Sequence, residues 1–203
     1  MDLKSTYDQI AEDWNKEHKD STWWVAGTDK FISFLKPGAR VLDIGCGPGI
    51  KSKYLLDKGL DIVGIDFSEK MIEIAKREVP LGKFYVKDIY DLKSFDEMFD
   101  GIFAQAVLLH VPKNRIKEVL KNLVAKLNTQ GCFYVAVKQI RSDEKDERLE
   151  TEDNYGYSYE RFFSYFSLDE IKKFMSDVGL TVRYEDISRF GRTDWIQVIG
   201  TKE

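Results

Sequence analysis

The feature that most constrains the fold is residues 41–49, VLDIGCGPG, where a short apolar run leads into three glycines spaced by one residue. Such a run is typical of a strand buried on both faces, as in parallel sheets. The glycines allow a tight turn and let a ligand approach the backbone without meeting a Cβ atom. Residues 50–58 follow with helical spacing, and Gly59 is placed as a C-terminal cap. The pattern predicts a strand–turn–helix unit that binds a nucleotide.

Length and composition limit the kinds of partner and compartment that we expect. The chain has 203 residues, enough for one well-buried domain, and we expect a single domain over residues 1–203. A net charge of −4 gives no support to a nucleic-acid partner. Cys46 and Cys132 lack metal-ligand spacing, so we expect no metal site and two reduced thiols in a cytoplasmic protein. The N-terminus lacks the apolar core of a signal peptide, and no apolar run approaches the roughly 18 residues of a membrane span.

Strand and helix patterns alternate along the rest of the chain. Helices are expected over residues 5–19, 22–35, 50–58, 69–79, 116–127 and 168–178. Strands are expected over residues 41–44, 61–65, 83–87, 99–105, 131–137, 181–187 and 195–200. The last two strands have no helix between them, which predicts an antiparallel hairpin at one sheet edge. The expected fold is an α/β three-layer sandwich with a doubly wound, mostly parallel seven-stranded sheet and an antiparallel C-terminal hairpin.

Three helix starts carry capping residues. Ser5 is positioned to cap the first helix, and Ser68 to cap the helix that Pro80 ends. Ser167 with Glu170 forms a capping-box pattern before the last helix.

Residues 138–166 do not fit the alternation, because they form a connection far longer than the usual loop of an α/β unit. The first half is acidic, and the second half is rich in aromatic residues. The segment follows the fifth strand, so it starts at the same sheet edge as the glycine turn. We expect it to fold over an acceptor pocket; the alternative is that its aromatic residues only complete the core.

Two details of the glycine turn distinguish between nucleotide classes. In the dinucleotide fingerprint the third glycine comes one residue later than Gly49 does here. Asp43 also puts a carboxylate just before the turn, where it would repel a pyrophosphate and attract a cationic ligand. S-adenosylmethionine (SAM) carries an ammonium, a sulfonium and no phosphate, and it fits both details.

At this point the sequence resembles the class I, Rossmann-like SAM-dependent methyltransferases. The resemblance is carried by residues 42–49 (LDIGCGPG), 63–68 (VGIDFS), 87–89 (KDI) and 99–102 (FDGI), within a span of about residues 39–137. It implies one methyltransferase domain, with residues 1–38 as an N-terminal helical cap and residues 138–166 as an acceptor-side insertion. An α/β domain with no ligand is the alternative reading.

The resemblance also implies roles for residues near the strand ends. Asp43 and the turn backbone would hold the methionine part of SAM, with Gln105 nearby, and Asp66 would accept from the ribose hydroxyls. Phe67 and Met71 would pack against adenine, and Asp88 and Ile89 would meet its amino group. In this family the N-terminal helix commonly covers bound SAM. The cofactor-binding residues expected are therefore Asp43, Gly45, Cys46, Gly47, Gly49, Asp66, Phe67, Met71, Asp88, Ile89, Gln105, Tyr7 and Trp14. A strand-end Asp is otherwise a helix cap or turn residue, and Tyr7 and Trp14 are otherwise core residues.

Candidate acceptor-side residues follow the fourth strand and lie in the long connection. His110 is expected as a general base or hydrogen-bond partner at the carboxyl edge of the sheet, and the alternative is a capping or packing residue. The run LLHVP at residues 108–112 resembles a bacterial and archaeal small-molecule branch of the family. Tyr157 and Arg161 are expected to bind substrate, Arg161 through an anionic group, although an exposed arginine is the simpler reading.

The sequence therefore predicts a SAM-dependent methyltransferase that acts on a small-molecule acceptor and releases S-adenosylhomocysteine (SAH). The position of Gly49 and the carboxylate of Asp43 argue against a nicotinamide-dependent oxidoreductase. A non-catalytic SAM-binding protein, or a methyltransferase of tRNA or protein, stays open as an alternative. The acceptor, the element that is methylated and the oligomeric state do not follow from the sequence.

Overall fold

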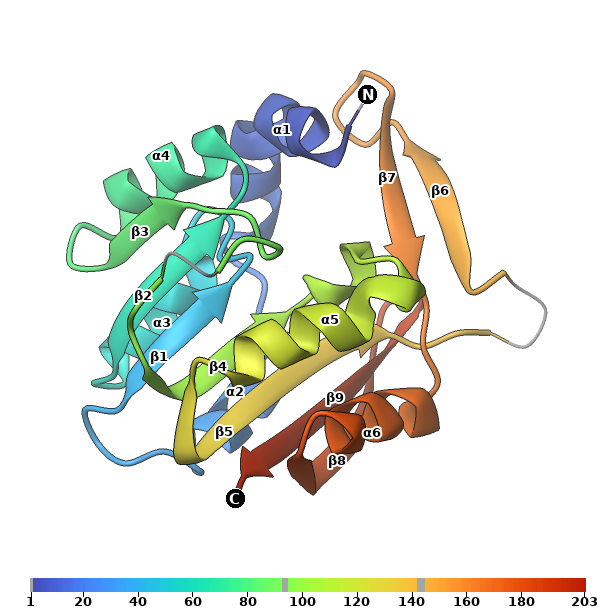
Figure 1. Cartoon of the computed structure of the whole chain (residues 1–203). Coiled ribbons are helices and arrows are strands. Elements are labelled where there is room, and N and C mark those ends of the chain that lie inside the picture. Colours follow the sequence, from blue (N-terminus) through green and yellow to red (C-terminus); the bar gives the residue numbers. More distant parts are fainter. Residues whose placement is uncertain (1, 93–94, 142–144) are drawn as a thin grey trace.

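A seven-stranded sheet forms the centre of the computed structural model, which describes residues 2–92, 95–141 and 145–203 (Figure 1). The strands lie in the order β3-β2-β1-β4-β5-β9-β8. β3, β2, β1, β4 and β5 are parallel, whereas β9 pairs antiparallel with both β5 and β8. Their bounds are β1 Arg40–Ile44, β2 Asp61–Asp66, β3 Lys83–Val86, β4 Phe99–Gln105, β5 Leu127–Lys138, β8 Leu180–Phe190 and β9 Thr193–Lys202. The predicted fold class and the antiparallel C-terminal hairpin are confirmed.

Helices cover both faces of this sheet. They are α1 Leu3–His18, α2 Val25–Ile32, α3 Ile50–Asp57, α4 Glu69–Glu78, α5 Lys113–Val124 and α6 Leu168–Asp177, with the short 3₁₀ helix η1 Leu108–His110. α5 and α6 lie in front of the sheet in Figure 1, and α2 and α3 lie behind it. On the α2 face, Phe31 packs against Phe103 and Tyr134, all three fully buried. None of the described helices is long and apolar enough to span a membrane.

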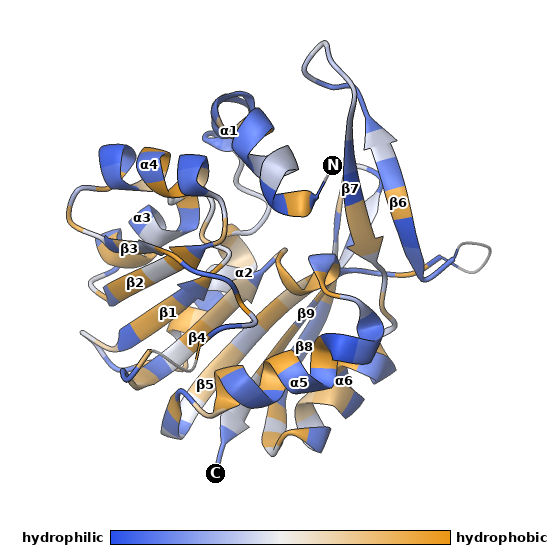
Figure 2. Ribbon diagram, turned by 45° about the horizontal axis from the view of Figure 1, so that its top comes forward, coloured by the Kyte–Doolittle hydropathy of each residue, from blue (hydrophilic) through white to orange (hydrophobic). Residues whose placement is uncertain are grey.

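The central strands are apolar along almost their whole length because both of their faces are covered. Figure 2 shows this as hydrophobic colouring of β1, β2, β4 and β5, with hydrophilic residues on the outer sides of the helices. Four of the five residues of β1 are buried. Buried parallel strands end at the same sheet edge, and this arrangement creates the site described below.

The first helix begins earlier than expected. Its N-cap is Asp2, whose Oδ1 accepts a hydrogen bond from Ser5 N at 2.8 Å, so the prediction that Ser5 caps the helix is wrong. The Asp2 carboxylate accepts from a backbone N–H of the first turn that has no partner within the helix. Its negative charge also interacts favourably with the positive end of the helix dipole. Ser68 caps α4, and Ser167 with Glu170 forms the predicted capping box of α6.

The long connection contains a second sheet that the sequence did not predict. Its strands β6 (Glu147–Glu152) and β7 (Tyr159–Ser164) pair antiparallel, with Leu149 opposite Phe162. In Figure 1 this hairpin stands beside α1, above the carboxyl edge of the parallel strands. We call α1 together with the hairpin, residues 147–164, the cover.

Hydrogen bonds near both ends of α1 join the two parts of the cover. Thr6 Oγ1 donates to the Glu160 carbonyl at 3.0 Å. At the other end, Tyr155 donates to Glu17 at 2.6 Å and Tyr157 donates to Asp13 at 2.8 Å. The N-terminal helix and the hairpin are therefore connected to each other, although more than a hundred residues separate them in the sequence.

Candidate functional site

The glycine turn after β1 is built by backbone geometry that favours glycine. Gly45, Gly47 and Gly49 have φ angles of 63°, 53° and 84°, in the left-handed region. A Cβ atom on Gly45 would also lie 2.6 Å from Val107 Cγ2. Gly47 N donates to Asp66 Oδ2 at 3.0 Å, which joins the turn to the end of β2. The turn and the end of β2 thus form one wall of a cleft.

Two adjoining cavities occupy this cleft, with volumes of about 250 and 70 Å³. They share the lining residues Gly45, Asp66, Phe67, Val107 and His110. The larger one extends toward the end of β3, and the smaller one lies between the turn and α1. Together they form an elongated site at the carboxyl edge of the sheet, which is where open α/β folds bind ligands.

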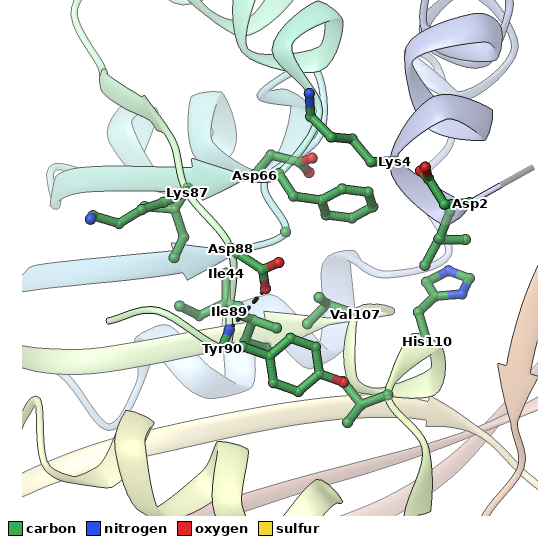
Figure 3. Close-up of a pocket in the computed structure, with 15 residues that line it drawn as sticks. Asp2, Lys4, Ile44, Asp66, Lys87, Asp88, Ile89, Tyr90, Val107 and His110 are labelled. Carbon is green, nitrogen blue, oxygen red and sulfur yellow. Dashed lines mark hydrogen bonds between the residues drawn. The ribbon is translucent and has the colours of Figure 1, made fainter. Parts of the chain in front are cut away.

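Two carboxylates point toward the larger cavity, that of Asp66 at the end of β2 and that of Asp88 after β3 (Figure 3). The Asp66 side chain is 8% exposed and accepts from Ser68 N at 2.9 Å as well as from Gly47 N. Asp88 is exposed, and its Oδ1 accepts from Tyr90 N at 2.9 Å. Phe67 and Ile89 supply apolar walls between them. Both aspartates therefore also support their own turns, the alternative that the sequence left open, while they line the cavity.

The smaller cavity brings together residues from four stretches of the chain. Those predicted to contact a cofactor and found in its wall are Tyr7, Trp14, Asp43, Gly45, Cys46, Gly47, Asp66, Phe67, Met71 and Gln105. Ala106 also lines it, with a φ angle of 57° that is unusual for a residue other than glycine. Backbone strain of this kind is found preferentially at functional sites. The structure thus brings these residues together in one cavity wall, and their contact with a cofactor stays a prediction.

Two polar side chains in the smaller cavity lack hydrogen-bond partners among the described residues. Gln105 is 6% exposed, and neither its Nε2 nor its Oε1 is bonded. The Lys51 ammonium lies 5.2 Å from the centre of the Trp14 ring and 5.8 Å from that of Trp24, with no hydrogen bond or ion pair to a described residue. Unpaired buried polar groups are costly, so they indicate a ligand that would bond to them.

Lys51 was not among the predicted site residues. It follows the glycine turn at the second position of α3, where nothing in the local pattern distinguishes it from an exposed lysine. Its place in the cavity depends on α1 and α2, which bring the two tryptophans over it. The sequence does show two helical segments with tryptophans before β1. This pattern does not indicate which residue the tryptophans cover.

Burial shifts the ionisation of the charged groups here. It raises the pKa of Asp43 to about 7, partly offset by a 2.6 Å hydrogen bond from Ser52 and by the Lys51 charge. Burial also raises the pKa of Asp66 to about 6, although the hydrogen bonds from Ser68 N and Gly47 N act to lower it. Burial lowers the pKa of Lys51 to about 8, although the nearby charge of Asp43 acts to raise it. A ligand carrying both signs of charge would stabilise all three ionised forms.

A hydrogen-bonded chain closes the cleft on the side of the cover. His110 Nδ1 lies 2.7 Å from the Phe162 carbonyl, which can only accept, so Nδ1 carries a hydrogen. Tyr7 then donates to His110 Nε2 at 2.8 Å, and Arg161 Nη1 donates to the Tyr7 oxygen at 3.2 Å. Arg161 also makes a bidentate ion pair with Glu152 at 2.5 and 2.6 Å. Arg161 is therefore a buried, paired residue rather than an exposed one.

The surroundings of His110 keep its ring neutral. Burial is the main cause that lowers its pKa to about 3, the bond to Phe162 opposes this, and the charges of Arg161 and Lys138 add to it. In this arrangement the lone pair of Nε2 accepts the Tyr7 hydroxyl.

Some predicted site residues lie elsewhere. Gly49 lines neither cavity; a Cβ atom there would lie 3.0 Å from Val79 Cγ2, so this glycine allows α3 to approach α4. Met71 and Asp88 were both expected beside adenine, but Met71 lines the smaller cavity and Asp88 the larger one. Tyr157 lines neither and bonds to Asp13, so its contact with substrate stays a prediction.

The fold and the cleft define a Rossmann-like α/β protein with a ligand site at the carboxyl edge of its parallel strands. A family model described as a methyltransferase domain matches residues 17–185, most of the chain. The chain therefore belongs to the methyltransferase-domain family, and the resemblance found in the sequence is confirmed.

Individual relatives share part of this chain. The ubiquinone biosynthesis O-methyltransferase of Coxiella burnetii is 28% identical over 145 residues, which are 63% of this chain and 58% of that protein. The trans-aconitate 2-methyltransferase of Variovorax paradoxus is 32% identical over 111 residues, which are 54% of this chain and 42% of that protein. The chain thus matches about half the length of these curated relatives.

Solved structures confirm the fold. The 1,6-didemethyltoxoflavin N1-methyltransferase of Burkholderia thailandensis, crystallised with its named substrate and SAH, superposes with a TM-score of 0.79 at 18% identity. The superposition covers 98% of this chain and 87% of that one.

Proposed function

We propose that this protein is a SAM-dependent methyltransferase that transfers a methyl group to a small-molecule acceptor and releases SAH. The observation that carries the proposal is the cleft itself, which has Asp66 and Asp88 at one end and, at the other, Lys51 and Gln105, whose side chains have no hydrogen-bond partner among the described residues. That arrangement suits a nucleoside joined to a zwitterionic amino acid. A nicotinamide dinucleotide has no amino-acid end and would place a pyrophosphate near Asp43.

The residues present fit SAM at each of its parts. Asp66 would accept from the ribose hydroxyls, Phe67 and Ile89 would enclose the base, and Asp88 would accept from its amino group. Lys51 would bind the carboxylate of the amino acid, while Gln105 and Asp43 would accept from its ammonium. When bound, SAM supplies a methyl group on a sulfonium, a good leaving group. The task left to the protein is to align the acceptor and exclude water.

The cover is suited to excluding water. Tyr7 and Trp14 of α1 line the smaller cavity, and Tyr7 is bonded to both η1 and the hairpin. We propose that the chain works as one methyltransferase domain, in which residues 1–38 supply a cap and residues 138–166 an acceptor-side insertion. The named substrates of its relatives support a small-molecule acceptor, and the net charge of −4 disfavours a nucleic acid. Cys46 and Cys132 are free and buried, which supports a cytoplasmic location.

Calorimetry with SAM, SAH and NAD tests the cofactor, and release of SAH in a panel of metabolites tests the reaction. We expect SAM and SAH to bind and NAD to give no heat of binding. Tight NAD binding without SAM binding would reject the proposal. SAM binding with turnover only on tRNA or protein would mean that the acceptor is a macromolecule and not a small molecule. SAM binding without any turnover would favour a regulatory role.

We further propose that His110 removes a proton from the acceptor or holds it by a hydrogen bond. Its ring lines both cavities, and only the Tyr7 hydroxyl separates its Nε2 from the smaller one. Rotation of that hydroxyl would free the lone pair, or Tyr7 itself would pass a proton to His110. Either route needs a neutral imidazole, which burial maintains, with its hydrogen on Nδ1, where the bond to Phe162 holds it.

His110→Asn is the sharpest test of this role. The Asn amide can still donate to the Phe162 carbonyl in place of Nδ1, but it has no nitrogen in place of Nε2. We expect turnover to fall by about 10²- to 10⁴-fold, the usual contribution of general base catalysis, with SAH affinity within a factor of two. The pH profile should lose its acid limb, the fall in turnover that protonation of His110 causes at low pH. An unchanged kcat and pH profile would return His110 to a structural role.

A further inference from the structure

Lys138, the last residue of β5, lies between the sheet and the cover. In the β4–β5 register Gln105 faces Ala136. Side chains two residues apart share a sheet face, so Lys138 lies on the face of Gln105, about 7 Å further toward the cover. Its ammonium lies 3.8 Å from the centre of the Phe163 ring, and that ring lies 4.9 Å from the His110 ring. Lys138 therefore neighbours the part of the cleft that His110 closes.

The charges around Lys138 leave one positive charge without a partner. Glu150 pairs with Arg148 at 2.8 Å, and Glu152 pairs with Arg161 at 2.5 Å. Lys138 has no hydrogen bond from its ammonium and no ion pair within the described part of the chain. Its side chain is half-buried, and burial lowers its pKa. A cation removed from water without a counter-ion is unfavourable, and the aromatic ring offsets this only in part.

Aromatic rings lie next to the Lys138 ammonium. Phe163 and Tyr165 are buried, and both rings lie within 6 Å of the ammonium. The rings of Tyr7 and His110 continue this aromatic surface toward the smaller cavity. Aromatic rings beside a cation that has no ion-pair partner among the described residues match a planar ligand that carries one negative group.

We propose that the methyl acceptor is a planar carboxylic acid whose carboxylate binds to Lys138. The inference rests on the proposed function, since it concerns the acceptor of that reaction. Arg161 is already neutralised by Glu152, so Lys138 selects the charged group.

The same ion pair would affect His110. The positive charges of Lys138 and Arg161 oppose a charge on the His110 ring. Glu152 offsets the charge of Arg161, whereas no carboxylate of the described residues forms an ion pair with Lys138. A bound carboxylate would offset Lys138 and make protonation of His110 easier. An acceptor with the correct charge would thereby strengthen the base that acts on it.

The test uses benzoate and benzamide, which have the same shape and differ in charge. Each is titrated into protein saturated with SAH, while NMR follows the histidine rings. The chain has two histidines, and His18, stacked on Trp14, provides the second signal for comparison. We expect benzoate to shift the His110 signals saturably, to raise the pKa of His110, and to bind about tenfold more tightly than benzamide.

Lys138→Met keeps the length of the side chain and removes its charge. In this variant benzoate should bind no better than benzamide, with SAH affinity unchanged. Lys172→Met, on the outside of α6 where the lysine pairs with Glu185, removes one charge elsewhere and should keep the tenfold preference.

Three results would overturn the inference: equal binding of benzoate and benzamide by the wild type, no saturable benzoate shift, or a preference for benzoate that survives in Lys138→Met. Failure of the protein to bind SAH would instead overturn the proposed function, so the two failures are distinguishable.

Discussion

Asp66→Ala should weaken SAH binding by about 2–4 kcal/mol, because two charge-assisted hydrogen bonds to the ribose hydroxyls are lost. The carboxylate is placed for this by Gly47 N and Ser68 N, which hold it at 3.0 and 2.9 Å at the boundary of the two cavities. Calorimetry with SAH on the wild type and the variant measures the loss directly.

A loss of affinity through local unfolding has to be separated from loss of the ribose contact. Burial raises the pKa of Asp66 to about 6, so the folded protein binds a proton there more tightly than the unfolded chain does. Stability from this group is therefore present at low pH and is lost as the pH rises through 6. At pH 8 the buried Asp66 carboxylate is ionised, and its burial destabilises the folded protein. Alanine removes this destabilisation, which offsets the loss of the hydrogen bonds from Gly47 N and Ser68 N. We therefore expect the melting temperature of the variant to stay close to that of the wild type.

Asp61→Ala provides the matched control, since Asp61 lies at the opposite end of the same strand and forms only exposed ion pairs with Arg40 and Lys83 among the described residues. Its SAH affinity should match that of the wild type. If Asp66→Ala also binds SAH like the wild type, the nucleoside does not lie at the end of β2 and the assignment of the larger cavity is wrong.

The parallel strands could be predicted from sequence because their burial leaves a direct signal. β4 spans Phe99–Gln105, as predicted, since a strand covered on both faces is an almost continuous apolar run. Parallel order also places the carboxyl ends of β1, β2 and β4 at one edge of the sheet. The roles expected of Asp43, Asp66 and Gln105 at that edge came from the resemblance to the SAM-dependent methyltransferases.

The hairpin of the cover left no comparable signal. β6 reads ERLETE, which is mostly charged, and its burial alternates between exposed and half-buried. Such a strand is stabilised by pairing with β7 and by contacts with α1, and neither is visible in a local pattern. Lys51 and Lys138 were missed for a related reason. The surroundings of a lysine depend on distant elements, here α1 and α2 for Lys51 and the hairpin for Lys138, and no local pattern shows them.

Lys51→Met should weaken SAH binding by about 2 kcal/mol, the value of a charge-assisted hydrogen bond to a carboxylate. The same substitution should leave 5′-methylthioadenosine unaffected, because that ligand has the nucleoside and the sulfur of SAH but no amino acid. Calorimetry with both ligands therefore measures the contribution of Lys51 to the amino-acid end alone. Lys53→Met, two residues along α3 and paired with Asp57 on the surface, is the control and should bind both ligands as the wild type does.

The pH dependence gives this prediction an independent test. Burial lowers the pKa of Lys51 to about 8, so its ammonium is lost as the pH rises through that value. The wild type should prefer SAH to 5′-methylthioadenosine most strongly below pH 8, and the preference should narrow above it. In Lys51→Met the contribution of the ammonium is missing at every pH, so this narrowing near pH 8 should disappear. An equal loss for both ligands would mean that Lys51 maintains the shape of the cleft, because a group that binds only the carboxylate has no effect on a ligand that lacks one.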